Sequence, residues 1–347
     1  MDDPQTTLIV APSLTLEQAG VLADAIAADA LFADYQRRLA EETRRRHRAD
    51  LALFTRYLAE AGVQVGDLLA DPTAWQGMTW GLVQGFAAWQ LRAGYAVSSV
   101  NVRLSTIKAY ARVAAQAGGL SMEAYGHIQL VKGYRKAEAR HLDKDRPVTR
   151  RGAKKAKPRF LSLEEVARLK AQPNTPQGRR DAVLVCLFFD HGLRCGELAA
   201  LRVEQVHVEE GTICFDRPKV DKDDQTHLLS PHTREALTRY LQKDRPAGML
   251  LWGSRKGGAL TGGMSPRAIT KRINTLGKKR LGIPNLSAHD GRHTWTKWAV
   301  KGRTDLRSLM DAGGWSTPAM PLLYAESGQI ANAGVQLLTL EIAEEQQ

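Results

Sequence analysis

Four short stretches in the second half of the sequence contain side chains that could cleave a phosphodiester bond. They are HGLRCGELAAL at 191–201, RPKVDKDD at 217–224, AHDGRHTW at 288–295 and AGGWSTPAMPLLYAE at 312–326. Cleavage by a protein nucleophile needs a hydroxyl that attacks, cations that surround the non-bridging oxygens as charge builds, and an acid that protonates the leaving oxygen. The four stretches supply such groups in order along the chain, so the sequence predicts this chemistry if they converge in the fold.

The same sequence favours a mechanism without a metal or a nucleotide. No cluster of acids of the kind that holds two metal ions stands out, and no phosphate-binding P-loop motif is present. A tyrosine hydroxyl suits such a mechanism. The phosphotyrosyl ester that it forms keeps the energy of the broken phosphodiester bond, so the reaction can be reversed onto a new strand of nucleic acid without a cofactor. We therefore expect neither a cofactor nor a metal site.

Together the four stretches resemble the signature of the tyrosine recombinase, or phage integrase, family. That signature is an R-x-x-E-L box, a lysine in a β-hairpin, an H-x-x-R box, and a His or Trp followed nine residues later by a tyrosine. Each motif alone is common in unrelated proteins, whereas their order and spacing together are specific. The resemblance implies a site-specific recombinase that cleaves and rejoins DNA through a covalent 3′-phosphotyrosyl intermediate, as in DNA integration, excision or resolution.

The resemblance assigns a role to each position of the signature. Tyr324 would be the nucleophile, and Arg194 and Arg292 would hold the scissile phosphate, because a planar guanidinium donates to two phosphate oxygens at once. Neither arginine should tolerate lysine. His289 would contact the phosphate and help to manage the tyrosine proton, and Trp315 would donate its indole N–H to a non-bridging oxygen.

Further residues complete the implied site. Lys219, in the hairpin turn, would protonate the leaving 5′ hydroxyl, and Lys222 is the alternative, because sequence does not fix the register of a hairpin turn. Glu197 would support Arg194 as a neighbouring carboxylate, and His293 would be a structural neighbour.

The sequence departs from the family pattern at three places. Trp315 stands where most members have histidine, and Gly291 replaces a bulky apolar residue in the H-x-x-R box. Glycine there loosens the start of a helix by up to about 1 kcal/mol relative to alanine, and Trp295 or Trp298 could repack the space. The hairpin turn is unusually acidic, which leaves the choice between the two lysines open; its acids are Asp221, Asp223 and Asp224.

The elements that would position these residues form two domains. Helical patterns dominate both, with a capping box at Ser162 and Glu165 opening the second. TICFDR and QTHLLS, at 212–217 and 225–230, are typical of two short strands joined by a polar turn. We expect a mainly α protein with an N-terminal all-α bundle, which the resemblance identifies as a SAM-like core-binding domain. A mixed α/β catalytic domain with a small antiparallel hairpin would follow.

The expected bounds are 1–28 for an N-terminal extension, 29–134 for the helical DNA-binding domain, 135–159 for a linker, 160–335 for the catalytic domain and 336–347 for a C-terminal tail. Within the helical domain, residues 97–118 have a core stripe predicted by helical spacing. Its members are Val102, Thr106, Ala109 and Val113, which would leave Arg103, Lys108 and Arg112 on other faces, free for phosphate.

Positive charge is concentrated in the expected linker. The chain carries a formal net charge of +12, and residues 132–159 alone contain twelve Lys and Arg against three acids. Such a segment favours a polyanionic partner, because cations that neutralise phosphates release counterions. We interpret the segment as a basic strap along DNA; the alternative is a solvated connector.

The remaining composition is that of an ordinary globular protein. Hydrophobic residues make up 43%, no long apolar run could span a bilayer, and the acidic start MDDPQTTLIVAPSLTLEQ is unlike a secretory signal. We therefore expect no membrane role and a cytoplasmic location, on DNA. The odd number of cysteines, without metal-type spacing, predicts buried reduced thiols at Cys186, Cys195 and Cys214.

The expected partner is double-stranded DNA, which in this family's layout is enclosed by the two domains as a C-shaped clamp. The candidate phosphate contacts are exposed basic side chains of both domains. They are Arg44, Arg45, Arg46, Arg103, Lys108, Arg255, Lys256, Lys271 and Arg272.

The resemblance further implies a homo-tetramer on two paired DNA sites, with an accessory protein as a possible partner. The apolar VQLLTLEIA segment near the C-terminus would dock in a neighbouring protomer, the alternative being that it folds back on its own chain. Three other functions compete with the recombinase hypothesis: a topoisomerase with the same tyrosine chemistry, a catalytically silent DNA-binding scaffold, and a helix-turn-helix regulator. DNA strand cleavage distinguishes among them.

Overall fold

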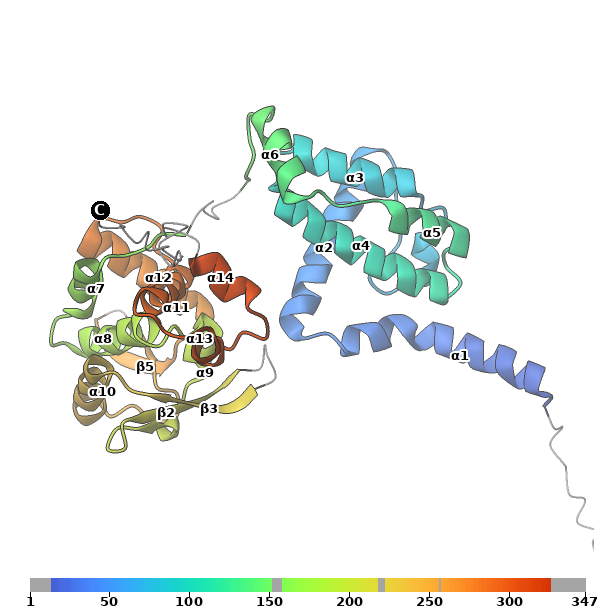
Figure 1. Cartoon of the computed structure of the whole chain (residues 1–347). Helices are drawn as coiled ribbons and strands as arrows, with labels where there is room; N and C mark the ends of the chain where they lie inside the picture. Colours follow the sequence, from blue (N-terminus) through green and yellow to red (C-terminus); the bar gives the residue numbers. More distant parts are fainter. Residues whose placement is uncertain (1–13, 152–157, 218–221, 256, 326–347) are drawn as a thin grey trace, which may run out of the picture. The chain divides into compact units, whose positions relative to one another are not determined.

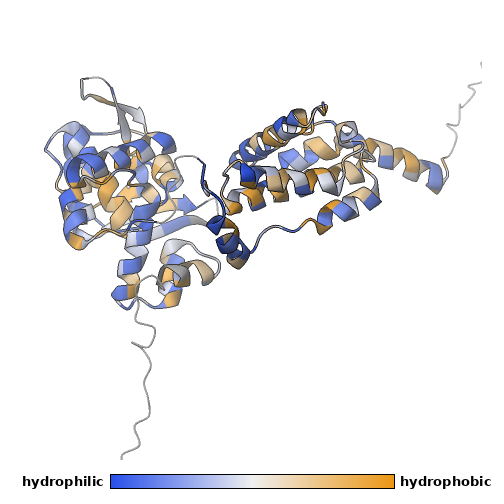
Figure 2. Cartoon of the chain, turned by 90° about the horizontal axis from the view of Figure 1, so that it is seen from above, coloured by the Kyte–Doolittle hydropathy of each residue, from blue (hydrophilic) through white to orange (hydrophobic). Residues whose placement is uncertain are grey.

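The computed structural model describes residues 14–151, 158–217, 222–255 and 257–325 (Figure 1). The chain divides into two compact units, Met1–Lys154 and Lys155–Gln347. Each unit has its own apolar core, and hydrophobic residues gather in the interior of both (Figure 2). The expectation of a mainly helical, two-domain protein is confirmed.

The first unit is entirely helical in its described part. Its helices are α1 (Leu16–Arg37), α2 (Glu41–Glu60), the 3₁₀ turn η1 (Pro72–Trp75), α3 (Trp80–Arg92), α4 (Val97–Gln116), α5 (Met122–Leu130) and α6 (Lys136–Lys144). Helix α4 packs against α1, α2, α3 and α5, so it is the centre of the bundle. Aromatic side chains of its neighbours fill the core, among them Phe54, Trp75 and Phe86, each fully buried.

The core stripe predicted for α4 is right at two of its four positions. Val102 is 39% exposed and Ala109 is only half-buried, whereas Val100, Leu104 and Ile107 are buried. Because α4 packs against four other helices, a wide face is covered, and the predicted stripe takes in only part of that face. Thr106 and Val113 do belong to the buried face.

Two domain bounds differ from those expected. Helix α1 runs without a break across the expected bound at residue 28. Helix α6 lies inside the segment expected to be a linker, and its Ala139 and Leu142 pack against a small buried cluster of Ala87, Leu91, Val97 and Val100. Arg146 extends this contact, since its Nη1 donates to the carbonyl oxygens of Leu91 and Tyr95 at 3.1 and 2.9 Å. The beginning of the basic segment is therefore part of the first unit.

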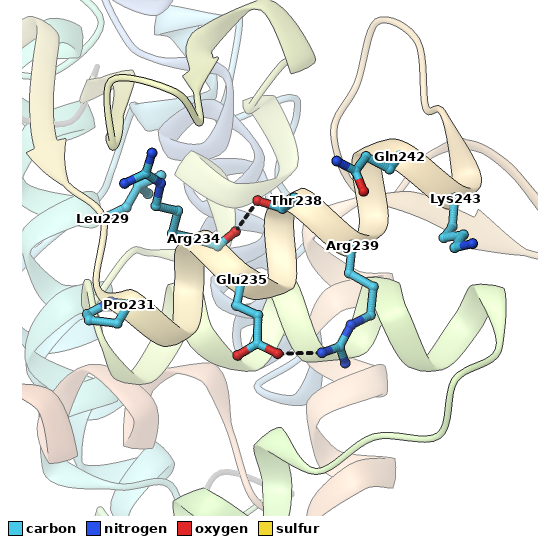
Figure 3. Close-up of a pocket in the computed structure, with 8 residues that line it drawn as sticks. All are labelled: Leu229, Pro231, Arg234, Glu235, Thr238, Arg239, Gln242 and Lys243. Atoms are coloured by element: carbon cyan, nitrogen blue, oxygen red, sulfur yellow. Dashed lines mark hydrogen bonds and ion pairs between the residues drawn. The ribbon is translucent and has the colours of Figure 1, made fainter.

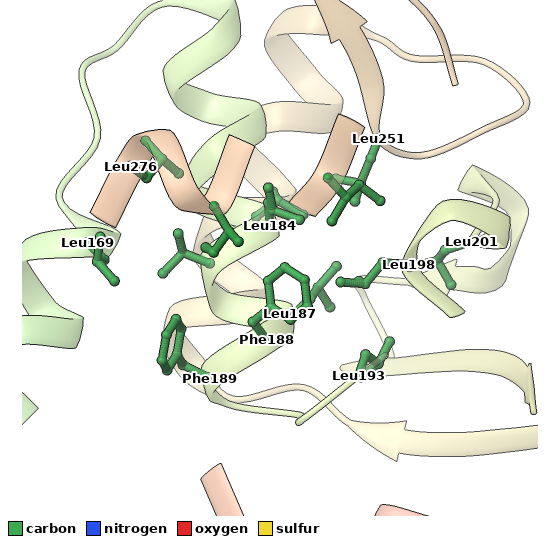
Figure 4. Packing of buried hydrophobic residues seen from close by; sticks show 14 of the residues in the cluster. Leu169, Leu184, Leu187, Phe188, Phe189, Leu193, Leu198, Leu201, Leu251 and Leu276 are labelled. Atoms are coloured by element: carbon green, nitrogen blue, oxygen red, sulfur yellow. The ribbon is translucent and has the colours of Figure 1, made fainter. Parts of the chain in front are cut away.

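The second unit surrounds one buried helix with helices and two small sheets. Its helices are α7 (Leu163–Lys170), α8 (Pro176–Phe189), α9 (Cys195–Ala200), η2 (Val203–Gln205), α10 (Pro231–Asp244), α11 (Pro266–Leu276), η4 (Gly277–Leu281), α12 (Ala288–Lys301), α13 (Leu306–Gly313) and α14 (Ala319–Ala325). The predicted capping box at Ser162 opens α7. Helix α8 contacts α7, α10 and α12, and the side chains of Leu184, Leu187 and Phe188 lie at the centre of the core (Figure 4).

The sheets are antiparallel, as predicted. Strands β1 (Val206–His207), β2 (Thr212–Arg217) and β3 (Lys222–Leu228) form one sheet in that order, and β4 (Trp252–Ser254) pairs with β5 (Leu260–Gly263) in the other. Strand β3 begins three residues earlier than expected, so Lys222 lies in the strand, paired with Arg217. Lys219 lies outside the described residues.

Candidate active site

Two arginines from distant parts of the second unit meet at one hollow of about 440 Å³. Arg194 stands at the N-cap of α9, and Arg292 lies in the second turn of α12. The other lining residues come from the same two regions and from α11; they are Leu193, Cys195, Gly196, Thr270, Ser287, Ala288 and His289. The N-termini of α9 and α12 both open here, and the partial positive charge of a helix N-terminus favours an anion.

Glu197 holds Arg194 in place at the edge of the hollow. One carboxylate oxygen of Glu197 accepts from the backbone N–H of Arg194 at 2.8 Å, and the other accepts from Nη1 at 2.6 Å. Nη2 of Arg194 donates to the carbonyl oxygen of Gly314 at 3.2 Å. The side chain remains 25% exposed, so the guanidinium is oriented yet still reachable from the hollow.

Arg292 is held more deeply. It is 3% exposed, its Nη1 donates to the carbonyl oxygen of Gly192 at 2.8 Å, and its Nη2 donates to that of Gly313. Its guanidinium carbon lies 4.2 Å from the centre of the Trp315 ring, which in turn stacks on Trp295. Gly192 allows this packing, because its backbone has a φ of +63° and an added Cβ would lie 2.4 Å from the Trp295 ring.

The beginning of α12 brings the histidines to the same place. His289 is exposed and lines the hollow, and its ring meets that of His293 edge-on, with the ring centres 4.3 Å apart. Ser287 and Asp290 form a capping box that starts the helix, and Asp290 also accepts from the backbone N–H of Arg159 at 2.9 Å. Gly291 lies against Phe188, whose Cβ would be 3.1 Å from an added Cβ, so the core fills the space without the tryptophans proposed from sequence.

Two family models match the chain with this site. The model described as Phage integrase family matches residues 159–329, and the model described as Phage integrase, N-terminal SAM-like domain matches residues 31–118. The first match includes all four stretches that carry the candidate residues, and the second covers most of the helical bundle. The chain belongs to the phage integrase family. It is a site-specific tyrosine recombinase acting on DNA, as the resemblance implied.

Curated tyrosine recombinases match most of the length of this family member. It is 24% identical over 301 residues to Tyrosine recombinase XerC of Xanthomonas axonopodis pv. citri (strain 306), which covers 84% of this chain and 88% of that protein. It is also 24% identical over 315 residues to Tyrosine recombinase XerD of Lacticaseibacillus casei, covering 88% and 93%. A shorter match to Tyrosine recombinase XerC of Pseudomonas fluorescens reaches 32% identity over 151 residues, 42% of this chain and 48% of that protein.

Solved integrase structures share the fold at lower identity. The Tn1549 transposon integrase in complex with transposon right end DNA gives a TM-score of 0.60 at 15% identity, over 87% of this chain and 96% of that chain. A lambda integrase dimer bound to a COC′ core site gives a TM-score of 0.57 at 12% identity, over 95% and 100%. Both relatives are seen with DNA.

The recombinase signature is thus partly assembled in the described residues. Arg194, Glu197, His289, Arg292 and Trp315 lie around the hollow or directly against its arginines. Tyr324 lies in α14, which contacts α12, but its side chain is outside the described part. Lys219 is not described at all, so the structure does not choose between the two candidate lysines.

One residue beside the site was missed by the sequence prediction. Arg217, the last residue of β2, is fully buried; its Nη2 donates to the carbonyl oxygen of Ala312 at 2.8 Å, and its Nε lies 3.7 Å from Glu197. Burial is the main cause that lowers its pKa, to about 10, so the side chain stays charged near neutral pH. The sequence did contain a sign that Arg217 is buried, because alternation along the strand places it on the same face as Ile213 and Phe215.

The candidate DNA contacts differ in how far they are already engaged. Arg44 and Arg45 form ion pairs one turn back, with Glu41 and Glu42, and Arg103 packs over Tyr95 and contacts Asp50. Three others also have partners: Arg46 contacts His47, Lys108 donates to the carbonyl oxygen of Gln129, and Arg272 pairs with Asp181. Arg255 and Lys271 are exposed, and Lys256 lies outside the described residues. Their role on DNA stays a prediction.

A larger hollow, about 650 Å³, lies on the surface of α10 and is a weaker candidate site (Figure 3). Its basic side chains do not converge on one point, because Arg239 pairs with Glu235 on its own helix and Arg234 donates to the carbonyl oxygen of Glu209. It shares no residue with the arginine hollow. Among the described residues, no group of acids, histidines or cysteines could hold a metal ion, and no helix has the length and apolar character to cross a membrane.

The cysteines are free thiols, but only Cys186 is buried. Cys195 and Cys214 are partly exposed, so the expectation of three buried thiols is wrong for these two.

Proposed function

We propose that this recombinase cleaves one DNA strand with the hydroxyl of Tyr324 and holds it as a 3′-phosphotyrosyl ester until the strand is rejoined. Arg194 and Arg292 would hold the scissile phosphate, with His289 and Trp315 beside them. The observation that supports this is the convergence of the two guanidinium groups on one hollow, with Gly313 accepting from both. Donors fixed in advance around a developing charge lower the barrier without reorganisation at the moment of reaction.

We assign proton transfer to the leaving 5′ oxygen to Lys219, with Lys222 as the alternative. Glu197 would act through Arg194, since its two oxygens fix the backbone and the guanidinium of that residue. In cleavage the phenolic oxygen of Tyr324 bonds to phosphorus, the bond to the 5′ oxygen breaks, and that oxygen takes up the proton. Rejoining is the same path in reverse, so no cofactor is consumed.

A covalent trap tests this proposal without knowledge of the target. Full-length protein is incubated with a supercoiled plasmid library of host and mobile-element DNA, the mixture is denatured, and DNA that remains attached to protein is sequenced. We expect an adduct with the wild type and none with Tyr324→Phe, while the matched control Tyr125→Phe, in α5, forms it normally. An adduct that persists in Tyr324→Phe would refute the assignment of the nucleophile.

We further propose that the active form is a tetramer on two paired DNA sites, joined by exchange of the C-terminal segment. The support is the apolar VQLLTLEIA run, which lies outside the described residues and whose sequence needs a surface to cover it. A chain ending at residue 335 should bind the recovered site but sediment as a smaller complex than the full chain, by analytical ultracentrifugation. Complexes of equal size would contradict segment exchange.

A further inference from the structure

The C-terminal end of α13 is surrounded by side-chain donors from three other elements. Arg217 donates to the carbonyl oxygen of Ala312, Arg292 to that of Gly313, and Arg194 to those of Gly313 and Gly314. Gln225 of β3 adds a fourth, donating to the carbonyl oxygen of Asp311 at 2.6 Å. Three consecutive carbonyls at the negative end of a helix dipole, those of Ala312, Gly313 and Gly314, therefore anchor the arginines of the site, and the carbonyl before them holds Gln225.

Arg217 differs from Arg194 and Arg292 because it does not line the hollow. It is fully buried, and among the described residues its Nε and Nη1 have no hydrogen-bond partner. A buried cation with unsatisfied donors is costly, so a place in a functional arrangement would explain it better than a contribution to stability. Its Nε lies 3.7 Å from a carboxylate oxygen of Glu197, the same group that fixes Arg194.

Arg217 also lies directly beneath the turn that leads to Trp315 and α14. Gly314 has a φ of +59°, and a Cβ added there would lie 2.3 Å from Nη1 of Arg217 and 2.8 Å from its Cδ. The glycine is thus needed both for the left-handed backbone and for the close approach of the guanidinium. This turn ends α13, and eight residues separate its Trp315 from Tyr324.

We propose that Arg217 is a positioning residue for DNA cleavage: its buried guanidinium fixes the Gly313–Gly314–Trp315 turn and Glu197 together, and so sets the tyrosine-bearing helix against the phosphate-holding arginines. The proposal rests on the proposed tyrosine mechanism. Arg217 touches neither the phosphate nor the reacting oxygens; it acts through Glu197 and the turn. A misplacement of about 1 Å at a reacting centre can cost about 100-fold in rate.

The test measures covalent adduct formation on a nicked duplex of the site recovered with the plasmid library, at saturating DNA. Arg217→Met, which fills the same space without charge, should slow adduct formation about 100-fold while the Kd for the duplex stays within about threefold. Arg217→Lys keeps the positive charge but replaces the forked guanidinium by a single ammonium. Its rate of adduct formation should therefore lie between those of the wild type and Arg217→Met. Arg179→Met is the matched control, because it removes the largely buried pair with Asp244, on α8 and α10, without touching the turn.

A second variant tests the same contact from the side of the turn and leaves Arg217 in place. Gly314→Ala should slow adduct formation by about tenfold or more in the wild-type background, because its methyl group displaces Arg217. In the Arg217→Met background the same change should cost less than about threefold, since residues that act through one contact are not additive. Equal effects in both backgrounds would overturn the proposal.

Two further outcomes would also overturn it. If a duplex with a sulfur leaving group restores the rate of Arg217→Met, the residue acts on the leaving-group side and not through the turn. If Arg179→Met slows the adduct as much as Arg217→Met does, any loss of a buried arginine suffices. Absence of an adduct with the wild type would instead reject the tyrosine mechanism, and this proposal with it.

Discussion

Arg194 and Arg292 are the two arginines proposed to hold the phosphate, and replacing each by lysine should separate its structural from its chemical contribution. Arg292 donates to carbonyl oxygens of two different segments, at Gly192 and Gly313, and a lysine ammonium at its site can reach only one of them. A lysine that keeps Gly313 leaves the carbonyl oxygen of Gly192 without this donor, which costs about 1–3 kcal/mol. Arg194→Lys is milder, because its side chain is 25% exposed and an ammonium can keep the ion pair with Glu197.

For a unit of this size, each kcal/mol shifts the melting temperature by about 2–4 °C. At about 2 kcal/mol, the middle of the range for the lost donor, we expect Arg292→Lys to lower the Tm of the second unit by about 4–8 °C, and Arg194→Lys to lower it by about 2 °C or less. Both should lose adduct formation by about 100-fold or more, as removal of one transition-state donor does.

Differential scanning calorimetry of the full chain gives the Tm values, and the covalent trap gives the rates. Equal Tm losses in the two variants would refute the idea that burial against the carbonyls distinguishes these arginines. Normal adduct formation by Arg292→Lys at a temperature where it is folded would refute its place at the phosphate.

Three other changes test neighbouring contacts. Gly192→Ala should destabilise the second unit by about 2 kcal/mol or more, because alanine must adopt a φ of +63° and its methyl group would meet the Trp295 ring at 2.4 Å. Chemical denaturation measures this loss, and an unchanged midpoint would contradict the prediction. Glu197→Gln should cost about 3–5 kcal/mol, since it leaves the buried cation of Arg217 without its carboxylate; a stability equal to that of the wild type, by the same assay, would mean that the 3.7 Å contact contributes nothing. Burial lowers the pKa of His191 to about 4 and that of His227 to about 3, from 6.5. Below pH 6.5 the unfolded chain therefore binds more protons than the folded chain. The stability that these neutral rings contribute is lost as pH falls from about 6.5 towards 4 and then 3. His227→Gln should flatten this acid decline in Tm, and an unchanged slope would assign the decline to other groups.

The sequence was enough to predict the motifs that form the hollow but not what lies behind them. Arg194, Glu197, His289 and Arg292 begin helices, and their spacing is a local property that one chain reveals. Arg217 is identified only by packing, because a lysine or arginine at the end of a strand is usually solvated and its burial depends on α13, nearly a hundred residues later in the chain. The alternation of β2 indicated the buried face but not its partner.

The helical unit shows the same limit. Its class followed from periodicity, whereas the buried face of α4 depends on four neighbours, and the place of α6 depends on an apolar surface of α3 and α4 that it covers. Gly291 illustrates a further case, since the loss of a side chain there was expected to loosen the helix. The proximity of Phe188 instead makes glycine the residue that fits.

The end of α13 has an electrostatic consequence. Three guanidinium groups gathered in one small volume repel one another, and the charge on Arg194 contributes to the lowered pKa of Arg217. The carbonyl dipoles of residues 312–314, together with Glu197, hold this cationic cluster together before any nucleic acid arrives. The carbonyl groups of the Gly313–Gly314 turn therefore offset part of the positive charge of the site. When a DNA strand enters the hollow, its phosphate replaces part of the electrostatic stabilisation that these carbonyls already give the arginines.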